Sequence, residues 1–152
     1  MIWTICFLIQ ENKICLAKKK RGHGIDKWNG TGGKPLEGES LENTARRETQ
    51  KEIGVTIRDL NKVAEIEFKD LSTRSSNFAT VFISTFWIGK PVETYEMRPK
   101  WYDFDKIPYS KMWSADRIWL PLIISGQTIK AVFEYKKDDV LKNFEIIHVN
   151  KF

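Results

Sequence analysis

Two glutamates spaced for one face of a helix carry the clearest chemistry in this sequence. Glu48 and Glu52 are four positions apart within residues 40–53, where the apolar spacing predicts a helix, so their carboxylates project to the same side. The preceding residues 22–33 are rich in glycine and can bring backbone carbonyls to the same place. Carboxylate and carbonyl oxygens suit Mg²⁺, or alternatively Mn²⁺, with several waters retained. Such an ion bridges phosphate oxygens and helps to ionise or orient an attacking water.

Acidic residues at this spacing are also common on helix faces that are merely solvated. Spacing alone therefore leaves a metal site and a solvated acidic face both open. Positive charge lies close by in the sequence, because residues 18–21 are KKKR and could hold the rest of a polyphosphate. Within this basic run, Lys19 is the site candidate.

A longer motif around the same helix is more specific. Residues 33–55 resemble the Nudix hydrolase signature, G-x5-E-x7-R-E-U-x-E-E-x-G-U, in which U is a bulky aliphatic residue. The residues that match at the required spacing are Gly33, Glu39, Arg47, Glu48, Glu52, Gly54 and Val55. A gapped match of this length rarely arises by chance.

The resemblance implies a fold, a reaction and residue roles. The implied fold class is α/β (α+β), a Nudix α/β/α sandwich with a mixed β-sheet between helices. The implied reaction is Mg²⁺-dependent hydrolysis of a nucleoside diphosphate linked to another group. Glu48 and Glu52 would be metal ligands, helped by the Gly32 carbonyl, and one of these two glutamates would be the general base. Arg47 would orient the acidic cluster, and Glu39 would brace the loop by ionic contacts.

Two positions within the motif differ from the family pattern. Thr49 stands at a bulky aliphatic position, which is a small change in packing. Lys51 stands where the family has the first glutamate of its acidic pair, so a negative charge is replaced by a positive one. We therefore expect fewer or weaker metal sites, and a contact of Lys51 with a phosphate or with a glutamate.

The resemblance extends through nearly the whole chain to the MutT-homologue branch, whose members hydrolyse oxidised purine nucleoside triphosphates. The segments that carry it are WNGTGGK (28–34), EMRPKWYDFDKIP (96–108), MWSADRIWLPL (112–122) and the final FEIIHV. By this resemblance the substrate-binding residues are Asn29, Trp113, Asp116, Phe68, Lys19 and His23, and Glu96 joins the metal site. A Trp face would stack on the base, whereas Asn and Asp would hydrogen-bond to the ring edge.

Ala115 occupies the place of the first of two aspartates that read the base in that branch. The expected function is hydrolysis of purine (deoxy)nucleoside triphosphates, such as 8-oxo-dGTP or dGTP, to monophosphate and pyrophosphate, in sanitisation of the nucleotide pool. Because one of the polar side chains that would recognise the base is missing, 8-oxo-dGTP, ordinary dGTP and a broader range of purines all stay open as substrates. Two further functions also stay open: a Nudix pyrophosphatase acting on a nucleotide sugar, a dinucleotide or an RNA cap, and a nucleotide-binding module weakened in catalysis by Lys51.

The bulk composition bounds the remaining expectations. A chain of 152 residues with 41% apolar residues fits one domain, and we predict a single Nudix domain over residues 1–152. The net charge of +5 favours anionic partners but is too small for a dedicated nucleic-acid binder, so no stable nucleic-acid complex is expected. Cys6 and Cys15 lie in strand-like runs and should be buried free thiols. The N-terminal apolar run is too short for a signal peptide or a membrane span, and we expect a soluble cytoplasmic monomer without membrane contact.

The elements that must position these residues can be outlined from the pattern. Strands are expected at 3–10, 13–19, 62–69, 77–89, 98–104, 129–136 and 144–150, with the last two closing a hairpin around residues 137–143. The metal-binding helix should begin after Ser40 as N-cap and end at Gly54. A second helix is expected at 114–126, with Pro121 in its first turn or kinking it.

Overall fold

A mixed eight-stranded sheet forms the centre of the molecule. The computed structural model describes all residues from Met1 to Phe152. The strands of this sheet are β1 (Ile2–Gln10), β2 (Lys13–Lys19), β3 (Trp28–Asn29), β5 (Asn61–Asp70), β6 (Ser75–Ser84), β8 (Met97–Asp103), β9 (Thr128–Lys136) and β10 (Val140–Val149). They lie in the order β10-β9-β5-β6-β1-β2-β3, and β8 pairs with β2 along its whole length, from Lys13↔Asp103 to Lys19↔Met97. The β1–β6 and β5–β9 pairs are parallel and the others are antiparallel, which confirms the predicted mixed sheet.

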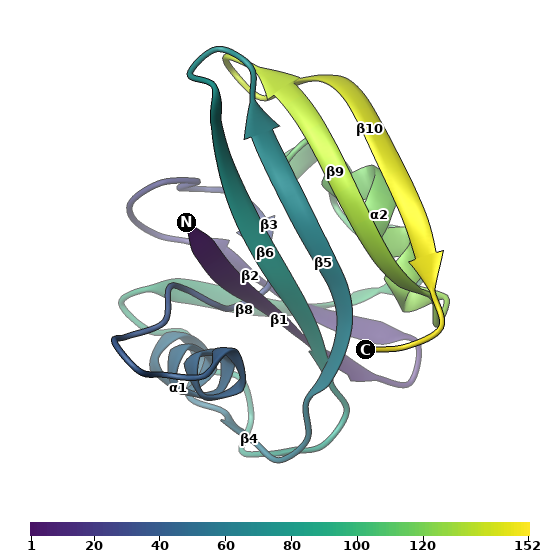
Figure 1. Cartoon of the computed structure of the whole chain (residues 1–152). Coiled ribbons are helices and arrows are strands. Elements are labelled where there is room, and N and C mark those ends of the chain that lie inside the picture. The colour runs from purple at the N-terminus through teal and green to yellow at the C-terminus, as the bar shows by residue number, and fades with distance from the viewer.

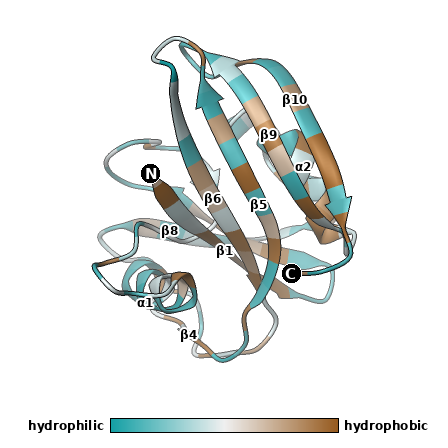
Figure 2. Cartoon of the chain, viewed as in Figure 1, coloured by the Kyte–Doolittle hydropathy of each residue, from teal (hydrophilic) through white to brown (hydrophobic).

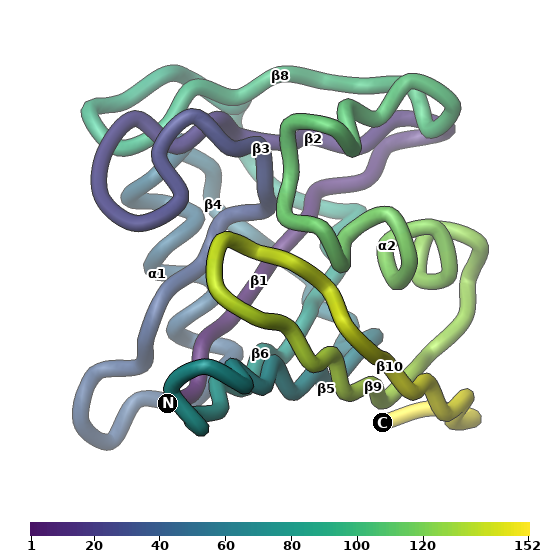
Figure 3. Tube along the Cα trace, turned by 90° about the horizontal axis from the view of Figure 1, so that it is seen from above, coloured from purple at the N-terminus to yellow at the C-terminus, as the bar shows by residue number.

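Two helices lie on opposite sides of β1, as both Figure 1 and Figure 3 show. Helix α1 (Leu41–Ile53) packs on β1, β4 and β8, whereas α2 (Asp116–Ile124) packs on β9. A small second sheet pairs β4 (Thr56–Ile57) with β7 (Trp87–Ile88), and two 3₁₀ turns span Phe104–Lys106 and Tyr109–Lys111. Neither α-helix is long and apolar enough to cross a membrane.

Each helix covers its own hydrophobic core, because side chains of a strand alternate between the two faces of a sheet. On β1, Phe7 joins the core under α2 and contacts Trp119, with ring centroids 6.1 Å apart. Its neighbours Cys6 and Leu8 join the core under α1 together with Ala45. Figure 2 shows bands of hydrophobic and hydrophilic residues along β9 and β10. Both cysteines are buried free thiols, as predicted.

The predicted limits of α1 are confirmed. The Ser40 hydroxyl accepts a hydrogen bond from the amide of Asn43, so it caps the first turn. Gly54 ends the helix in the left-handed region, with φ of 74°, and its amide donates to the carbonyl of Gln50. Ala45, Thr49 and Ile53 form the inward-facing stripe of α1 and are buried against the sheet. Glu48 and Glu52 therefore lie at the edge of the contact between α1 and the sheet.

Three predicted boundaries are wrong. The run 77–89 is not one strand: β6 ends at Ser84, since Asp59 accepts hydrogen bonds from Ser84 Oγ and from the amides of Thr85 and Phe86, and these bonds turn the chain towards β7. The last hairpin turns over residues 137–139, so that β10 already begins at Val140. The second helix is shorter than predicted at both ends.

Pro121 lies in the second turn of α2, so the first of the two predicted alternatives, a place in the first turn, is wrong, whereas a kink at Pro121 stays a prediction. Proline has no amide hydrogen and cannot bond to the carbonyl of Arg117 four residues earlier. The nine-residue helix tolerates this loss because Trp119, Leu120 and Ile123 bury its inner face.

Candidate active site

The glycine loop is inserted between two diverging strands. β1 and β2 pair only near their hairpin, from Leu8↔Cys15 to Gln10↔Lys13. Beyond that point β2 pairs with Trp28 and Asn29 of β3, while the β1 backbone bonds to the loop that follows. The amide of Cys6 donates to the carbonyl of Thr31 at 2.7 Å, and that of Thr4 donates to the carbonyl of Gly33 at 2.9 Å. The loop is therefore fixed as part of the sheet.

Two loop positions require glycine because neighbouring atoms leave no room for a side chain. Gly32 has a φ of 150°, and a Cβ there would lie 1.8 Å from the carbonyl oxygen of Thr4. A Cβ on Gly33 would lie 2.8 Å from Cδ of Glu48. The close approach lets the amide of Gly32 donate to Glu52 Oε1 at 2.8 Å. The loop thus orients Glu52 through the backbone N–H group of Gly32, a contact that the sequence did not predict. Metal binding by the Gly32 carbonyl stays a prediction.

Glu39 and Arg47 connect the start of the loop–helix unit to its acidic face. Arg47 Nε donates to Glu39 Oε2 at 2.8 Å and Nη2 donates to Oε1 at 2.9 Å. These bonds, with others from Thr44 and the Leu36 amide, hold the pKa of Glu39 down at about 2. The third guanidinium nitrogen, Nη1, donates to Glu48 Oε1 at 2.6 Å. The observed contacts are those expected if Glu39 braces the loop and Arg47 orients the acidic cluster.

Both carboxylate oxygens of Glu48 are held by cations. Arg47 contacts Oε1, and Lys51 Nζ lies 3.2 Å from Oε2. The expected contact of Lys51 with a glutamate is therefore present. Because Glu48 is buried while Lys51 is half exposed, an entering ion would have to compete with Lys51 for this carboxylate.

Glu52 is the carboxylate that faces the cleft described below. Burial, helped by the charges of Glu48 and Glu96, raises its pKa to about 7 against the opposing effects of the Gly32 amide and Lys51. Glu96 reaches this neighbourhood through Thr94, whose hydroxyl donates to the Glu52 carbonyl at 2.7 Å and accepts from the Glu96 amide at 3.1 Å. Sequence reasoning missed Thr94, since nothing in the local pattern links residue 94 to the end of α1.

The donor set fits a hard divalent ion. No three His, Cys, Asp or Glu side chains are close enough together to hold an ion without other ligands. Mg²⁺ normally takes only one or two carboxylates and completes its shell with waters and substrate phosphates. Burial is the main cause of the raised pKa of Glu52, and the charges of Glu48 and Glu96 add to it in the direction that a cation would oppose. Glu52, together with either Glu48 or Glu96, would hold such an ion along with waters and substrate phosphates.

One cleft of about 730 Å³ brings the predicted substrate-binding residues together. It is lined by all six of them, Asn29, Trp113, Asp116, Phe68, Lys19 and His23, and by Gly32 and Glu52. Glu48, Glu96 and Arg47 do not line this cleft. Phe68 stacks on Phe133 with ring centroids 6.0 Å apart, so its ring belongs both to the edge of the core and to the cleft wall.

Asp116 is buried and anchors the aromatic wall. Its Oδ2 accepts from the amide of Trp113 at 3.2 Å, and its Oδ1 accepts from Nε1 of Trp119 at 3.1 Å. Burial raises the pKa of Asp116 to about 7. The Trp113 ring stacks on His23, with centroids 5.1 Å apart and an interplanar angle of 25°, and Lys27 Nζ lies 4.7 Å from its centroid.

Lys19 differs from the other members of its basic run. Lys18 pairs with Asp26 at 4.0 Å, Lys20 with Glu93 at 2.8 Å and Arg21 with Glu96 at 3.9 Å. Lys19 pairs with no carboxylate and lines the cleft. It is thus the one cation of the run that is available to an anionic ligand there.

The turn of the β9–β10 hairpin also reaches the cleft. Asp138 and Asp139 line it, and Asp139 is hydrogen-bonded to Ser114 beside Trp113. The sequence showed only two adjacent aspartates in a polar turn, with no signal that this turn meets the segment before α2.

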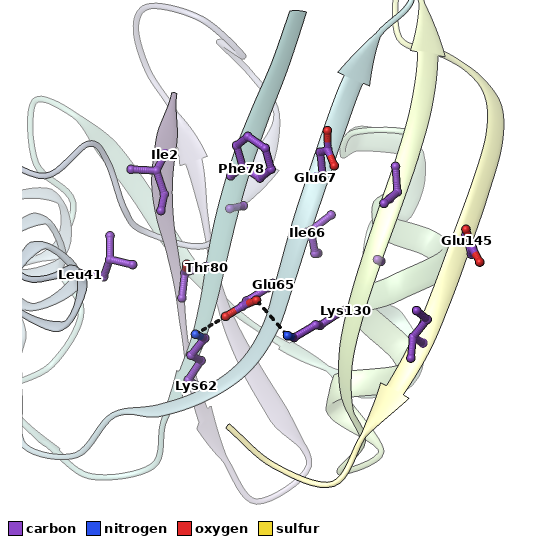
Figure 4. Close-up of a pocket in the computed structure, with 14 residues that line it drawn as sticks. Ile2, Leu41, Lys62, Glu65, Ile66, Glu67, Phe78, Thr80, Lys130 and Glu145 are labelled. Carbon is purple, nitrogen blue, oxygen red and sulfur yellow. Dashed lines mark hydrogen bonds and ion pairs between the residues drawn. The ribbon is translucent and has the colours of Figure 1, made fainter.

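A shallower hollow of about 420 Å³ lies on the outer face of the sheet (Figure 4). Its one central carboxylate, Glu65, pairs with both Lys62 and Lys130. None of the predicted site residues lines it. Because the predicted site residues gather in the cleft around Trp113 and not in this hollow, that cleft is the better candidate for a nucleotide site.

Comparison with known proteins identifies the family of this chain. The NUDIX domain model matches residues 3–123. An oxidized purine nucleoside triphosphate hydrolase from Danio rerio is 37% identical over 146 residues, covering 96% of this chain and 94% of the relative. The hydrolase of the same description from Mus musculus is 32% identical over 151 residues, covering 99% and 97%.

Solved structures show the same fold. A MutT protein from Bacillus halodurans superposes with a TM-score of 0.85 at 21% identity, covering 95% of this chain and 96% of that one. A MutT NUDIX hydrolase from Burkholderia pseudomallei gives a TM-score of 0.69 at 24% identity, covering 79% and 95%. The predicted α+β Nudix fold is confirmed. Since the domain match spans most of the chain and the relatives align over nearly all of it, this protein belongs to the Nudix family and is a Nudix pyrophosphohydrolase.

Proposed function

We propose that the protein hydrolyses purine nucleoside triphosphates, such as 8-oxo-dGTP or dGTP, to the monophosphate and pyrophosphate, with Mg²⁺ as cofactor. One observation carries the proposal: a single cleft is lined by Trp113, Asn29 and Asp116, which suit a purine, and by Lys19 and Glu52, which suit phosphates and a cation. The fish and mouse relatives, whose names state an oxidized purine triphosphate substrate, support it. The role of the enzyme would be sanitisation of the nucleotide pool.

The base would be recognised by stacking and by directional hydrogen bonds. The Trp113 ring supplies a flat face, worth about 1–3 kcal/mol for a stacked base. Asn29 Oδ1 accepts from the Gly30 amide at 2.8 Å, which leaves the side-chain NH₂ group to donate to the base. Asp116, with its raised pKa, is protonated in part near neutral pH and can both donate and accept at the ring edge.

Hydrolysis to these products requires in-line attack of water on one of the two phosphorus atoms of the α–β bridge, which breaks that phosphorus–oxygen bond and releases the monophosphate and pyrophosphate. A bound divalent ion would neutralise charge on the phosphates and lower the pKa of the attacking water. Glu52 is the better general base of the two glutamates, because Oε1 alone is engaged, whereas both oxygens of Glu48 contact cations. Lys19 would bind the phosphates as a point charge.

A nucleotide-binding protein with weakened hydrolysis is the second candidate. The observation that favours it is the contact of Lys51 with Glu48, since a cation of the protein itself occupies part of the acidic site.

A kinetic screen with pyrophosphate detection tests the proposal. The substrates are dGTP, 8-oxo-dGTP, 2-oxo-dATP and their ribonucleotide forms, with Mg²⁺, and Glu52→Gln serves as the inactive control. Release of pyrophosphate from a purine triphosphate, lost in the control, supports the proposal. Two monophosphates from a nucleotide sugar, dinucleotide or cap substrate would instead identify another Nudix pyrophosphatase. Tight binding of purine nucleotides without turnover would favour the binding protein.

A further inference from the structure

We propose that Asp139, in the turn between β9 and β10, is a positioning residue of the base pocket, which fixes Trp113 and Asp116 for base binding through its bond to Ser114. This inference rests on the proposed function, because it concerns binding of a purine in the same cleft. It assigns a task in recognition to a residue outside the family motif and outside the segments that carry the wider resemblance.

The contact between Asp139 and Ser114 is bidentate. The Ser114 amide donates to Asp139 Oδ2 at 2.7 Å, and the Ser114 hydroxyl donates to Oδ1 at 2.8 Å. Both are hydrogen bonds to a carboxylate, which are about twice as strong as bonds between neutral groups. The backbone between Trp113 and Ala115 is therefore fastened to the hairpin.

Trp113 is consequently fixed from both sides. Its own amide donates to Asp116 Oδ2, and the next amide, of Ser114, donates to Asp139 Oδ2. Two carboxylates from different elements thus hold two successive N–H groups and define both peptide planes that flank Trp113. The position of the indole ring follows from those planes and from its contact with His23.

The turn that carries Asp139 is itself well anchored. Pairing between β9 and β10 resumes immediately after it at Val140↔Lys136. The Lys137 amide donates to Ser72 Oγ at 3.0 Å, which joins this turn to the one between β5 and β6. Asp138 and Asp139 both adopt left-handed backbone conformations, with φ of 64° and 57°, which aspartate tolerates better than most residues. Through Asp139, the sheet can therefore restrict the motion of the segment that carries Trp113.

This arrangement matters more because residue 115 is alanine. Asp116 is the single acidic side chain that the segment 113–116 offers to a base, so its placement decides the hydrogen bonds at that edge. If the Asp116 carboxyl group is displaced by a fraction of a hydrogen-bond length, polar groups of the base and of the protein are left unpaired. Asp139 constrains this placement from outside the segment.

Calorimetric titration with dGMP and with pyrophosphate tests the inference on three variants. Asp139→Ala removes both bonds and should weaken dGMP binding about tenfold, the effect of roughly 1.4 kcal/mol, while leaving pyrophosphate binding unchanged. Asp139→Asn keeps an acceptor for the Ser114 amide and a donor for its hydroxyl, so it should bind dGMP within about twofold of the natural protein, given that both bonds persist. Glu11→Ala is the matched control, since it removes an exposed acidic side chain at the same left-handed backbone conformation, with φ of 56°, in a turn that does not line the cleft.

The results separate this inference from the proposed function. Weaker dGMP binding in Asp139→Ala, with recovery in Asp139→Asn and no change in Glu11→Ala, supports a positioning role. Equal dGMP affinity in all variants overturns that role and leaves the proposed function intact. Equal weakening in Glu11→Ala would show a general effect of losing an acidic side chain at a left-handed turn position and also overturns it. If the natural protein binds no purine nucleotide, the proposed function fails and the inference fails with it. Ser114→Ala, which removes one of the two bonds, gives a second measure should Asp139→Ala fold poorly.

Discussion

Lys51→Glu should increase the affinity of the acidic site for a divalent cation. In the structure Lys51 Nζ lies 3.2 Å from Glu48 Oε2, and Arg47 holds the other oxygen, so an ion must displace Lys51 to reach this carboxylate. At 3.2 Å two unit charges in a water-like dielectric attract by about 1.3 kcal/mol. The Lys51 side chain is 53% exposed, so this low figure for a solvated pair is the appropriate one.

An energy of this size corresponds to roughly tenfold in an equilibrium constant. Lys51→Gln, which only removes the competing charge, should therefore bind Mn²⁺ about tenfold more tightly than the natural protein. Lys51→Glu adds an attractive charge as well and should exceed that gain. Lys106→Glu is the control for net charge, because it makes the same charge change at an exposed residue that lines neither hollow.

Mn²⁺ titration in the absence of nucleotide, followed by calorimetry or by the electron paramagnetic resonance signal of the free ion, measures the effect without turnover. Equal Mn²⁺ affinity in the natural protein, Lys51→Gln and Lys51→Glu would refute the reasoning, because Lys51 would then not compete for Glu48. An equal gain in Lys106→Glu would attribute the effect to net charge instead of to the contact.

Other substitutions test separate parts of the site. Glu52→Gln should lower the turnover number by at least about a hundredfold, the typical effect of losing a general base, with folding intact by circular dichroism; full activity would exclude Glu52 as the base. Trp113→Ala should raise KM for purine triphosphates by roughly tenfold or more through lost stacking, with little change for inorganic pyrophosphate binding. Gly33→Ala should be destabilising in thermal unfolding, because the new Cβ would meet the Glu48 side chain at 2.8 Å; an unchanged unfolding midpoint would show that Glu48 moves freely. The pKa of Asp116 is about 7 in the folded chain against an ordinary value of 3.8, so the folded state binds this proton more tightly than the unfolded state. The free energy of unfolding gained from this bound proton is full below about pH 4 and is lost as pH rises through 7. Asp116→Asn has no carboxyl group to titrate, so its free energy of unfolding should fall less between pH 4 and 8 than that of the natural protein. Urea unfolding at the two pH values measures this difference.

The sequence by itself determined the local part of this protein. Helix α1 was predicted with both its ends, because Ser40 and Gly54 act within one turn of their own positions and the apolar stripe has the helical period. The spacing of Glu48 and Glu52 follows from the same period. Strands were recognised where alternation was strong, but their ends were misplaced where a distant residue such as Asp59 turned the chain.

The tertiary structure alone decided which residues meet. The insertion of the glycine loop between β1 and β2, the support of Glu96 by Thr94 and the bond from Asp139 to Ser114 each join positions that are distant in sequence or follow no period. The raised pKa of Asp116 likewise depends on burial, which a local pattern does not encode. Short-range hydrogen bonds and hydrophobic periodicity depend on residues that are neighbours in the sequence. The geometry of the cleft arises only when separate strands and turns pack together.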